Sequence, residues 1–506
     1  MNIESLVVER VSDAEARFER VRRVVGLALA PTVFLIVLLL PLAGLKPEAH
    51  RLAAVMATVI VLWVTEALPL PMTALLGAAG CVVLRVAPAK DVFAPFADPL
   101  MFLFIGSFIL ARAIFLHRLD RRLAFGVLSI KWVGASPSRI LFAFGAVTAF
   151  ISAWISNTAT TAMMFAIGMA ILAFLFDNER AGGSPISRRY ATGLMLMTSF
   201  AASIGGLATP IGTPPNVIGL GFIRQLLGVE ISFFKWTLIG APIVIILFLY
   251  LFFYLNTLCR AGVREIAGSS EMLRSEKERL GAWTRGQRST LIAFLVTVAL
   301  WVVPGIIALA FGDRSDIYQT VNRSVPEAVA AVVGAGLLFL LPGDEGGARA
   351  ITWEEAVKID WGVVLLYGGG FALGVLSFQT GLAEAVGRGL TGLLPVSGGL
   401  GLLFASVLVA VIVSEATSNT ASANMVVPVV IAIARAQGAD PLEPALGATL
   451  GASLGFMLPV STPCNAIVYG SGYVPLTRMI RYGILLDVVG VFVIVALVRL
   501  LIPFIR

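Results

Sequence analysis

Long apolar runs dominate the chain, and short polar stretches separate them. Several runs extend over about 20 residues, the length that a helix needs to cross the roughly 30 Å hydrocarbon core of a bilayer. The runs begin near Val25, Leu52, Met72, Leu100, Ile140, Ala159, Ala191, Trp236, Leu291, Ala328, Val363, Leu402, Ala421, Ala445 and Ile484. This pattern predicts an all-α polytopic membrane protein, because an outer-membrane barrel would show short alternating strands instead.

Some of the runs are short and interrupted by polar residues, notably around Ser156, Gly212, Ser418 and Thr462. A run of this kind is better explained by a re-entrant hairpin or a broken helix than by a plain span. We therefore expect about 11 transmembrane helices and two re-entrant hairpins, and we place the hairpins at 138–178 and 399–436.

Composition excludes a water-soluble protein. Hydrophobic residues make up 58% and charged residues 13% of the 506 residues, whereas about 25% of an ordinary globular protein is charged. A mean hydropathy of +0.93 leaves too little polar surface for a soluble particle. The three cysteines are far apart and the two histidines stand alone, so we expect neither a metal site of these residues nor a cofactor.

The positions of Lys and Arg predict the orientation. They lie at the ends of apolar runs, which explains the net charge of +7 without a nucleic-acid partner. With a cytoplasmic N-terminus, the inside loops hold 24 of the 37 Lys and Arg residues and the opposite loops hold about ten. By the positive-inside rule we expect the N-terminus inside and the C-terminus outside.

These boundaries divide the chain into four parts. Residues 1–24 are polar and form either an amphipathic helix on the membrane surface or a solvated cytoplasmic tail. Residues 25–258 and 289–506 form two halves, each with one of the two hairpins. The Arg- and Glu-rich residues 259–288 form a cytoplasmic linker between the halves.

The two halves carry the same markers in the same order, which indicates an internal duplication. Residues 152–159 show the pattern S-x-x-x-S-N-T-A, and the same pattern returns 262 residues later. Gly106 matches Gly369, and T-P-P-N at 213–216 is echoed by T-P-C-N at 462–465. Five expected spans separate the hairpins, and an odd number inverts the second copy, so the two tips can meet near the midplane.

Each Ser-Asn-Thr motif can bind a cation and an anion. Its hydroxyl and amide oxygens suit a hard cation, its N–H and O–H groups can donate to a carboxylate, and the helix that follows attracts anions at its N-terminus. In T-P-P-N and T-P-C-N, proline breaks the helix and frees backbone carbonyls that suit sodium. One such motif would more often hold helices together, but two copies, each with its broken helix, predict a binding site.

Other polar residues within the runs are less informative. We expect Glu66 to be structural and Arg112 to form an ion pair or to extend to the interface. Glu415 could serve an ion site, as membrane carboxylates often do, or accept hydrogen bonds at the hairpin tip. No general base accompanies Cys464, and no nucleotide-binding or protease motif is present, so we do not expect an enzyme.

Together these motifs resemble the divalent anion/sodium symporter family, which includes dicarboxylate, citrate and sulfate carriers. The resemblance extends from about residue 50 to the C-terminus and includes T-E-A-L-P-L-P at 65–71, both Ser-Asn-Thr motifs, G-T-P-P-N at 212–216 and T-P-C-N at 462–465. It implies a homodimer in which a mobile transport domain moves against a fixed scaffold, as in an elevator.

The resemblance also implies the site residues. A first sodium ion would be bound by Ser152, Ser156, Asn157 and the carbonyl of Gly212, and a second by Ser414, Thr417, Asn419 and the carbonyl of Ser461. The substrate carboxylates would be held by Asn157, Thr158, Thr213, Ser418, Asn419, Thr420 and Thr462. Sodium-independent exchangers of the family are expected to carry a fixed basic group in place of sodium, and no Lys or His lies beside either motif in the sequence.

We therefore expect a sodium-coupled importer of C4-dicarboxylates (succinate, malate or fumarate) in the inner membrane of a bacterium. Sodium-independent dicarboxylate exchange and transport of tricarboxylates or sulfate are alternatives within the family. A channel would need a continuous polar stripe along its spans. A dianion without a basic partner requires at least two bound cations, and a third would let the membrane potential drive uptake.

Overall fold

The computed structural model describes residues 13–42, 44–180, 185–312, 314–391 and 398–504. Within these ranges the regular structure is helical, apart from one isolated β-bridge between Pro342 and Arg349. Ten described helical segments are long and apolar enough to cross a membrane, or eleven if the bent pair at 316–340 forms one span. The prediction of an all-α polytopic membrane protein is confirmed.

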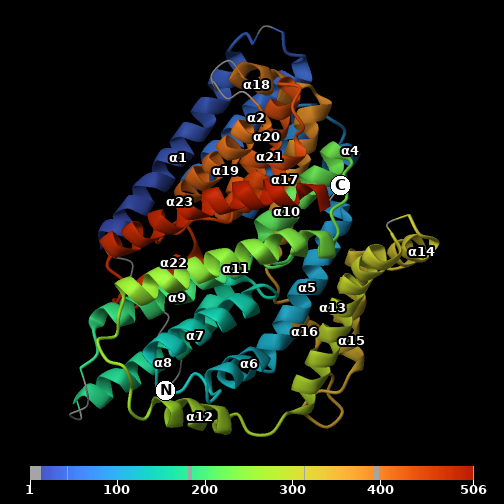
Figure 1. The fold of residues 1–506 in the computed structure, drawn as a ribbon. Helices are drawn as coiled ribbons and strands as arrows, with labels where there is room; N and C mark the ends of the chain where they lie inside the picture. Colours follow the sequence, from blue (N-terminus) through green and yellow to red (C-terminus); the bar gives the residue numbers. More distant parts are fainter. Residues whose placement is uncertain (1–12, 43, 181–184, 313, 392–397, 505–506) are drawn as a thin grey trace.

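The first half of the chain contains the helices from α1 to α11 (Figure 1). They are α1 (Asp13–Leu39), α2 (Pro47–Thr65), α3 (Leu70–Val83), α4 (Ala89–Phe93), η2 (Ala94–Ala97), α5 (Pro99–Leu116), α6 (Leu119–Leu128), α7 (Pro137–Ser152), α8 (Asn157–Arg180), α9 (Arg188–Gly205), α10 (Pro214–Phe222), the π-helical η3 (Ile223–Leu227) and α11 (Phe233–Leu258). Helix α1 begins within the segment 1–24 that we expected to be polar, and residues 1–12 of that segment lie outside the described residues.

The expected linker at 259–288 contains α12 (Ser269–Arg279), and the second half follows it. Its helices are α13 (Arg285–Phe311), α14 (Asp316–Ser324), α15 (Glu327–Leu340), α16 (Trp353–Ala356), α17 (Trp361–Gln379), α18 (Leu382–Thr391), α19 (Gly399–Ala416), α20 (Asn419–Ala436), α21 (Leu442–Gly451), α22 (Pro463–Tyr469), α23 (Leu476–Leu501) and η4 (Ile502–Phe504).

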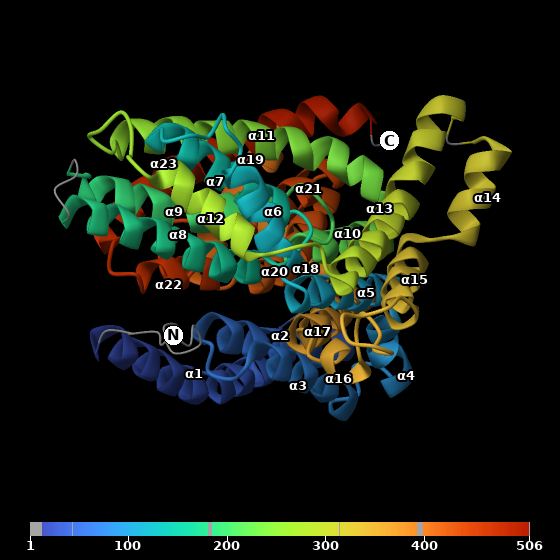
Figure 2. The same cartoon turned by 90° about the horizontal axis from the view of Figure 1, so that it is seen from below.

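The helices gather in two groups. Figure 2 shows α1, α2, α3, α16 and α17 on one side, and α7, α8, α9, α11 and α23 on the other. In the first group α2 packs against α1 and α3, and α3 packs against α17. In the second group α7 packs against α9 and α11, and α19 packs against α21 and α23.

The helix order from α5 to α11 returns from α17 to α23. Each copy has a long helix, a short helix, a pair of helices joined at a Ser-Asn-Thr motif, a broken helix and a long last helix. The second parts of the broken helices are exchanged between the copies: α10 packs against α20 and α21, whereas α22 packs against α8 and α9. The helix pair at each Ser-Asn-Thr motif therefore packs against a short helix from the other half of the chain.

Two glycines at matching positions allow close helix contacts. A Cβ on Gly106 of α5 would lie 2.5 Å from the carbonyl carbon of Ala331 in α15. A Cβ on Gly369 of α17 would lie 2.6 Å from the Cβ of Ala74 in α3. Only glycine permits this approach, because non-bonded heavy atoms cannot pack so closely.

Candidate functional site

Each Ser-Asn-Thr motif lies where one helix ends and the next begins. Asn157 is the first residue of α8 and Asn419 is the first residue of α20. The hydroxyls of Ser156 and Ser418 accept hydrogen bonds from the backbone N–H three residues later, at 3.4 and 3.2 Å. These serines cap helices whose first N–H groups have no partner within the helix, so each tip offers donors for an anion.

The Asn157 side chain connects its own tip to the first broken helix. One terminal atom of the amide lies 2.8 Å from Ser152 Oγ, 3.1 Å from the Ala202 carbonyl oxygen and 3.2 Å from the Gly212 carbonyl oxygen. Carbonyl oxygens only accept, so the amide nitrogen occupies this position. The structure thus brings Ser152, Asn157 and Gly212, three of the four residues expected at the first sodium site, into contact.

Asn419 makes the corresponding contacts in the second copy. Ser414 Oγ lies 2.8 Å from Asn419 Oδ1, and Asn419 Nδ2 donates to the Ser453 carbonyl at 3.3 Å. A Cβ on Gly455 would lie 3.3 Å from Asn419 Oδ1, 3.4 Å from Ser414 Oγ and 3.6 Å from Ser461 Cβ. Three of the four residues expected at the second sodium site therefore lie around Gly455, and the oxygens of Asn419 and Ser414 face it.

The fourth residue expected there, Thr417, is directed differently. Thr417 is buried and extended, with φ −138° and ψ −163°. Its hydroxyl donates to the carbonyl of Val413 at 2.8 Å. The hydroxyl oxygen retains lone pairs for a cation, but its proton is already used within α19.

Two further asparagines, for which no role was predicted, stabilise the loops of the broken helices. Each side-chain nitrogen donates to the carbonyl oxygens ten and seven residues earlier, at 2.9 and 2.8 Å for Asn216 and at 3.0 Å each for Asn465. The helices begin at matching N-caps, Thr213 with φ −146° and Thr462 with φ −145°. The signal was present, because asparagine recurs at the fourth position of both T-P-x-N sequences.

One cavity of about 750 Å³ lies between the two tips. Its wall contains every residue expected to hold the substrate, namely Asn157, Thr158, Thr213, Ser418, Asn419, Thr420 and Thr462. Among the expected sodium ligands, Ser156, Gly212 and Ser461 also line it, whereas Ser152, Ser414 and Thr417 are buried and do not. Polar groups from both copies thus face the same space.

The wall formed by α5 and the start of α17 carries charged residues that were not predicted at the site. Arg112, Lys358 and Asp360 line the cavity. Arg112 Nη2 and Lys358 Nζ each lie 2.5 Å from a carboxylate oxygen of Glu355, and these two partners lower the pKa of Glu355. Lys358 is far in sequence from either motif, so only the three-dimensional fold brings it here.

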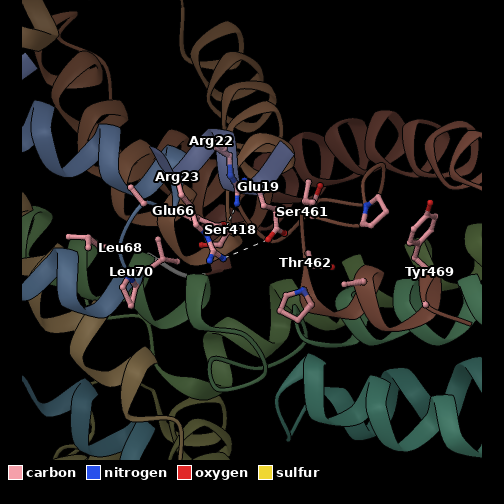
Figure 3. A pocket seen from close by; sticks show the side chains of 17 residues that line it. Glu19, Arg22, Arg23, Glu66, Leu68, Leu70, Ser418, Ser461, Thr462 and Tyr469 are labelled. Atoms are coloured by element: carbon pink, nitrogen blue, oxygen red, sulfur yellow. Dashed lines mark hydrogen bonds and ion pairs between the residues drawn. The ribbon is translucent and has the colours of Figure 1, made fainter. Parts of the chain in front are cut away.

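A second pocket, of about 520 Å³, adjoins the cavity, and both have Ser418, Ser461 and Thr462 in their walls. Figure 3 shows these residues facing charged side chains of α1. There Arg22 Nη2 lies 2.7 Å from Glu66 Oε2. Glu66 adopts a left-handed conformation, with φ 47°, where α2 ends, so its ion pair fastens α1 to this turn.

Comparisons of the sequence with known proteins give consistent matches. Residues 21–503 match the family model described as the sodium:sulfate symporter transmembrane region. The sodium-dependent dicarboxylate transporter SdcS of Staphylococcus saprophyticus is 33% identical over 494 residues, which cover 97% of this chain and 93% of that protein. SdcS of Staphylococcus aureus strain USA300 is 32% identical over 491 residues, which cover 95% and 91%.

Two solved transporter structures resemble the fold at 13% sequence identity. The YdaH transporter of Alcanivorax borkumensis has a TM-score of 0.52 over 96% of this chain and 98% of that one. MtrF of Neisseria gonorrhoeae has a TM-score of 0.55 over 90% and 95%. At this identity the likeness concerns the fold alone.

Proposed function

Because the chain belongs to the sodium:sulfate symporter family, we propose that it is a secondary active transporter that couples uptake of C4-dicarboxylates, such as succinate, malate and fumarate, to sodium. The observation that carries this proposal is a cavity lined by both Ser-Asn-Thr motifs and by both threonines that precede the broken helices. Two related sets of donors facing one space suit a ligand with a carboxylate at each end.

The substrate would lie between the N-termini of α8 and α20. Asn157 and Thr158 would donate to one carboxylate, and Asn419 and Thr420 to the other, with Ser418, Thr213 and Thr462 completing the wall. The partial positive charge at each helix N-terminus would add to these hydrogen bonds.

Sodium would bind on the buried side of each tip. At the first site Asn157 now directs an amide nitrogen at the Gly212 carbonyl. A sodium ion bound by that carbonyl together with Ser152 and Ser156 repels the nitrogen, so Asn157 has to turn its oxygen to the ion. The turned nitrogen is then free to donate to a substrate carboxylate. This turn would couple sodium binding to substrate binding through one side chain.

Sodium would also neutralise the substrate. The basic residues on the cavity wall, Arg112 and Lys358, share the carboxylate of Glu355, and Asp360 lies on the same wall. The two positive and two negative charges sum to zero, so the cavity wall offers no net positive charge to balance a bound dianion. Two sodium ions beside the tips would supply it, which explains why substrate would not enter without them.

For the transport step we propose an elevator. Helices α7–α11 and α19–α23 would form the mobile domain, and α1–α5 and α13–α17 the scaffold of a homodimer. The short helices α6 and α18 join the two parts in sequence. The protein would lie in the bacterial inner membrane with its N-terminus in the cytoplasm and its C-terminus outside.

Sodium-independent dicarboxylate exchange is the second candidate, and the presence of Lys358 and Arg112 at the cavity favours it. In that mechanism a fixed basic group would replace the coupling ion. The ion pairs with Glu355 argue for symport instead, because they occupy both basic groups. Tricarboxylate or sulfate transport is not favoured by any contact in the cavity.

The test is uptake of labelled succinate into proteoliposomes with and without an inward sodium gradient, and with internal succinate in a parallel set. We expect accumulation with the gradient alone. Uptake that requires internal succinate and does not depend on the sodium gradient would establish exchange. If neither condition gives uptake, labelled citrate and sulfate are tested in the same vesicles, and failure of all three substrates would refute the proposal.

A further inference from the structure

Two carboxylates meet behind the second hairpin tip. Glu415 lies in the last turn of α19, and Asp487 lies in α23. Glu415 is 5% exposed and Asp487 is 4% exposed. The two carboxyl groups lie close enough to repel each other when both are charged. Charges buried in an apolar helical bundle require compensation, and two like charges require it more strongly.

Glu415 and Asp487 differ in their hydrogen bonds. The backbone N–H of Met457 donates to Glu415 Oε1 at 2.8 Å, and the Ser461 hydroxyl donates to Oε2 at 2.5 Å. Within the described ranges, neither oxygen of Asp487 receives a hydrogen bond. The groups that approach Asp487 include Glu415, the backbone N–H of Phe456 and the Tyr254 phenol, and no arginine or lysine of the described chain is among them.

The register of α11 and α23 shows what corresponds to Asp487 in the first copy. A Cβ on Gly240 of α11, or on Gly483 of α23, would lie 2.4 Å from a carbonyl oxygen in the loop of that copy's broken helix. The two glycines are therefore equivalent. Asp487 lies four residues after Gly483, so its equivalent is Val244.

The first copy lacks both acids. The 262-residue offset of the Ser-Asn-Thr motifs pairs Glu415 with Ala153. Both members of the acidic pair therefore correspond to apolar residues, although the tips, the capping serines and the asparagine contacts are duplicated. The fold of a copy does not require the acids, so their presence together in one copy points to a ligand that only this copy binds.

We infer that Glu415 and Asp487 bind an additional sodium ion, separate from the two sites at the Ser-Asn-Thr motifs. The oxygens of Asp487 and a lone pair from each Glu415 oxygen form a set of hard oxygen ligands. A cation between the carboxylates replaces their repulsion by attraction. The inference rests on the proposed function and assigns one more coupling ion to it.

A third sodium ion changes the energetics of transport. Three sodium ions with one dianion carry a single net positive charge into the cell. At equilibrium this charge increases accumulation by about 50-fold for each 100 mV of inside-negative potential. Two sodium ions with one dianion are electroneutral and give no such response.

The experiment compares succinate accumulation in proteoliposomes at zero potential and at a potassium diffusion potential of about −100 mV. We expect the wild type to gain about 50-fold, and Asp487→Asn to remain sodium-dependent but to lose the response to potential. Glu443→Gln is the matched control, because this buried acid has its own partner, Arg499, 2.7 Å away. This control should behave like the wild type.

A second measurement does not depend on transport. Sodium added to purified protein should raise its melting temperature, and the slope against the logarithm of sodium concentration should be lower in Asp487→Asn than in wild type and Glu443→Gln. Equal slopes, an electroneutral wild type, or an Asp487→Asn variant that keeps the voltage response would each overturn the inference. The inference would also fail if Asp487→Asn changed only the pH dependence of transport. In that case a shared proton, and not a sodium ion, would lie between Glu415 and Asp487. Absence of all uptake by wild type would refute the proposed function instead, and the melting experiment would still test the ion site.

Discussion

At each hairpin tip a single asparagine side chain contacts both the preceding helix and the loop of a broken helix. Asn157 reaches Ser152 and Gly212, and Asn419 reaches Ser414 and Ser453. Because the same side chains line the cavity, each lies between the expected ion and the expected substrate. A change of either residue should therefore affect both ligands.

We expect Asn157→Ala and Asn419→Ala each to reduce succinate uptake by at least about 100-fold, because each loses a ligand for the ion and a donor to a charged carboxylate. Folding should be preserved, as judged by yield and gel-filtration profile. Asn178→Ala is the control, since Asn178 contacts the exposed backbone of Ala267. Uptake at the wild-type level in either tip variant would contradict the assigned site.

Asp120 gives a prediction for the pH dependence of stability. It lies in the first turn of α6, outside the long apolar helices, and burial raises the pKa of its carboxyl from 3.8 to about 6. The folded state therefore holds the proton more tightly than the unfolded state. This stabilising contribution is complete below pH 3.8 and is lost as the pH rises to about 6, by up to about 3 kcal/mol.

Asp120→Asn should remove this dependence, because the amide resembles the protonated acid. Melting temperatures in detergent between pH 4.5 and 7.5 should fall with pH in the wild type and less in the variant. The variant should melt at the higher temperature at pH 7.5. The exposed Asp177, paired with Arg180, supplies Asp177→Asn as a control that keeps the wild-type profile, and a variant with an unchanged pH profile would refute the assignment.

At the scale of helices, close packing of α5 on α15 depends on Gly106. Gly106→Ala would place a methyl carbon 2.5 Å from the backbone of Ala331, and we expect a loss of about 1–3 kcal/mol from overpacking. Gly336→Ala in the same helix pair meets no atom within 4 Å and should be neutral or stabilising. Melting temperatures of both variants test this prediction. Equal stability would show that α5 and α15 can move apart with no loss of free energy of unfolding.

Much of this arrangement was open to prediction from the sequence, because apolar runs, proline breaks and repeated motifs are local signals. The helix starts at Asn157 and Asn419 follow from the motifs themselves. The position of Lys358 at the cavity did not follow, since it depends on how α17 packs against α3 and α5. The roles of Asn216 and Asn465 were not predicted, because an asparagine that donates to loop carbonyls cannot be recognised from a sequence pattern.

At the scale of the whole molecule, the exchange of α10 and α22 between the copies makes the halves interdependent. Separate expression of residues 1–281 and 282–506 divides the chain in an exposed loop after Gly281. We expect neither half to transport succinate alone. Co-expressed halves should purify together and restore sodium-dependent uptake, and uptake by a single half would show that the exchanged helices are dispensable.

The exchange of α10 and α22 also determines when their contacts can form during synthesis of the chain. The ribosome completes the first hairpin at about residue 180, but α22, which packs against α8 and α9, follows roughly 300 residues after α8 begins. At about 5–20 residues per second this delay lasts roughly 15–60 s. During that time the polar tip around Asn157 has no α22 beside it, so the nascent chain depends on the insertion machinery to shelter the tip from lipid until its partner is made.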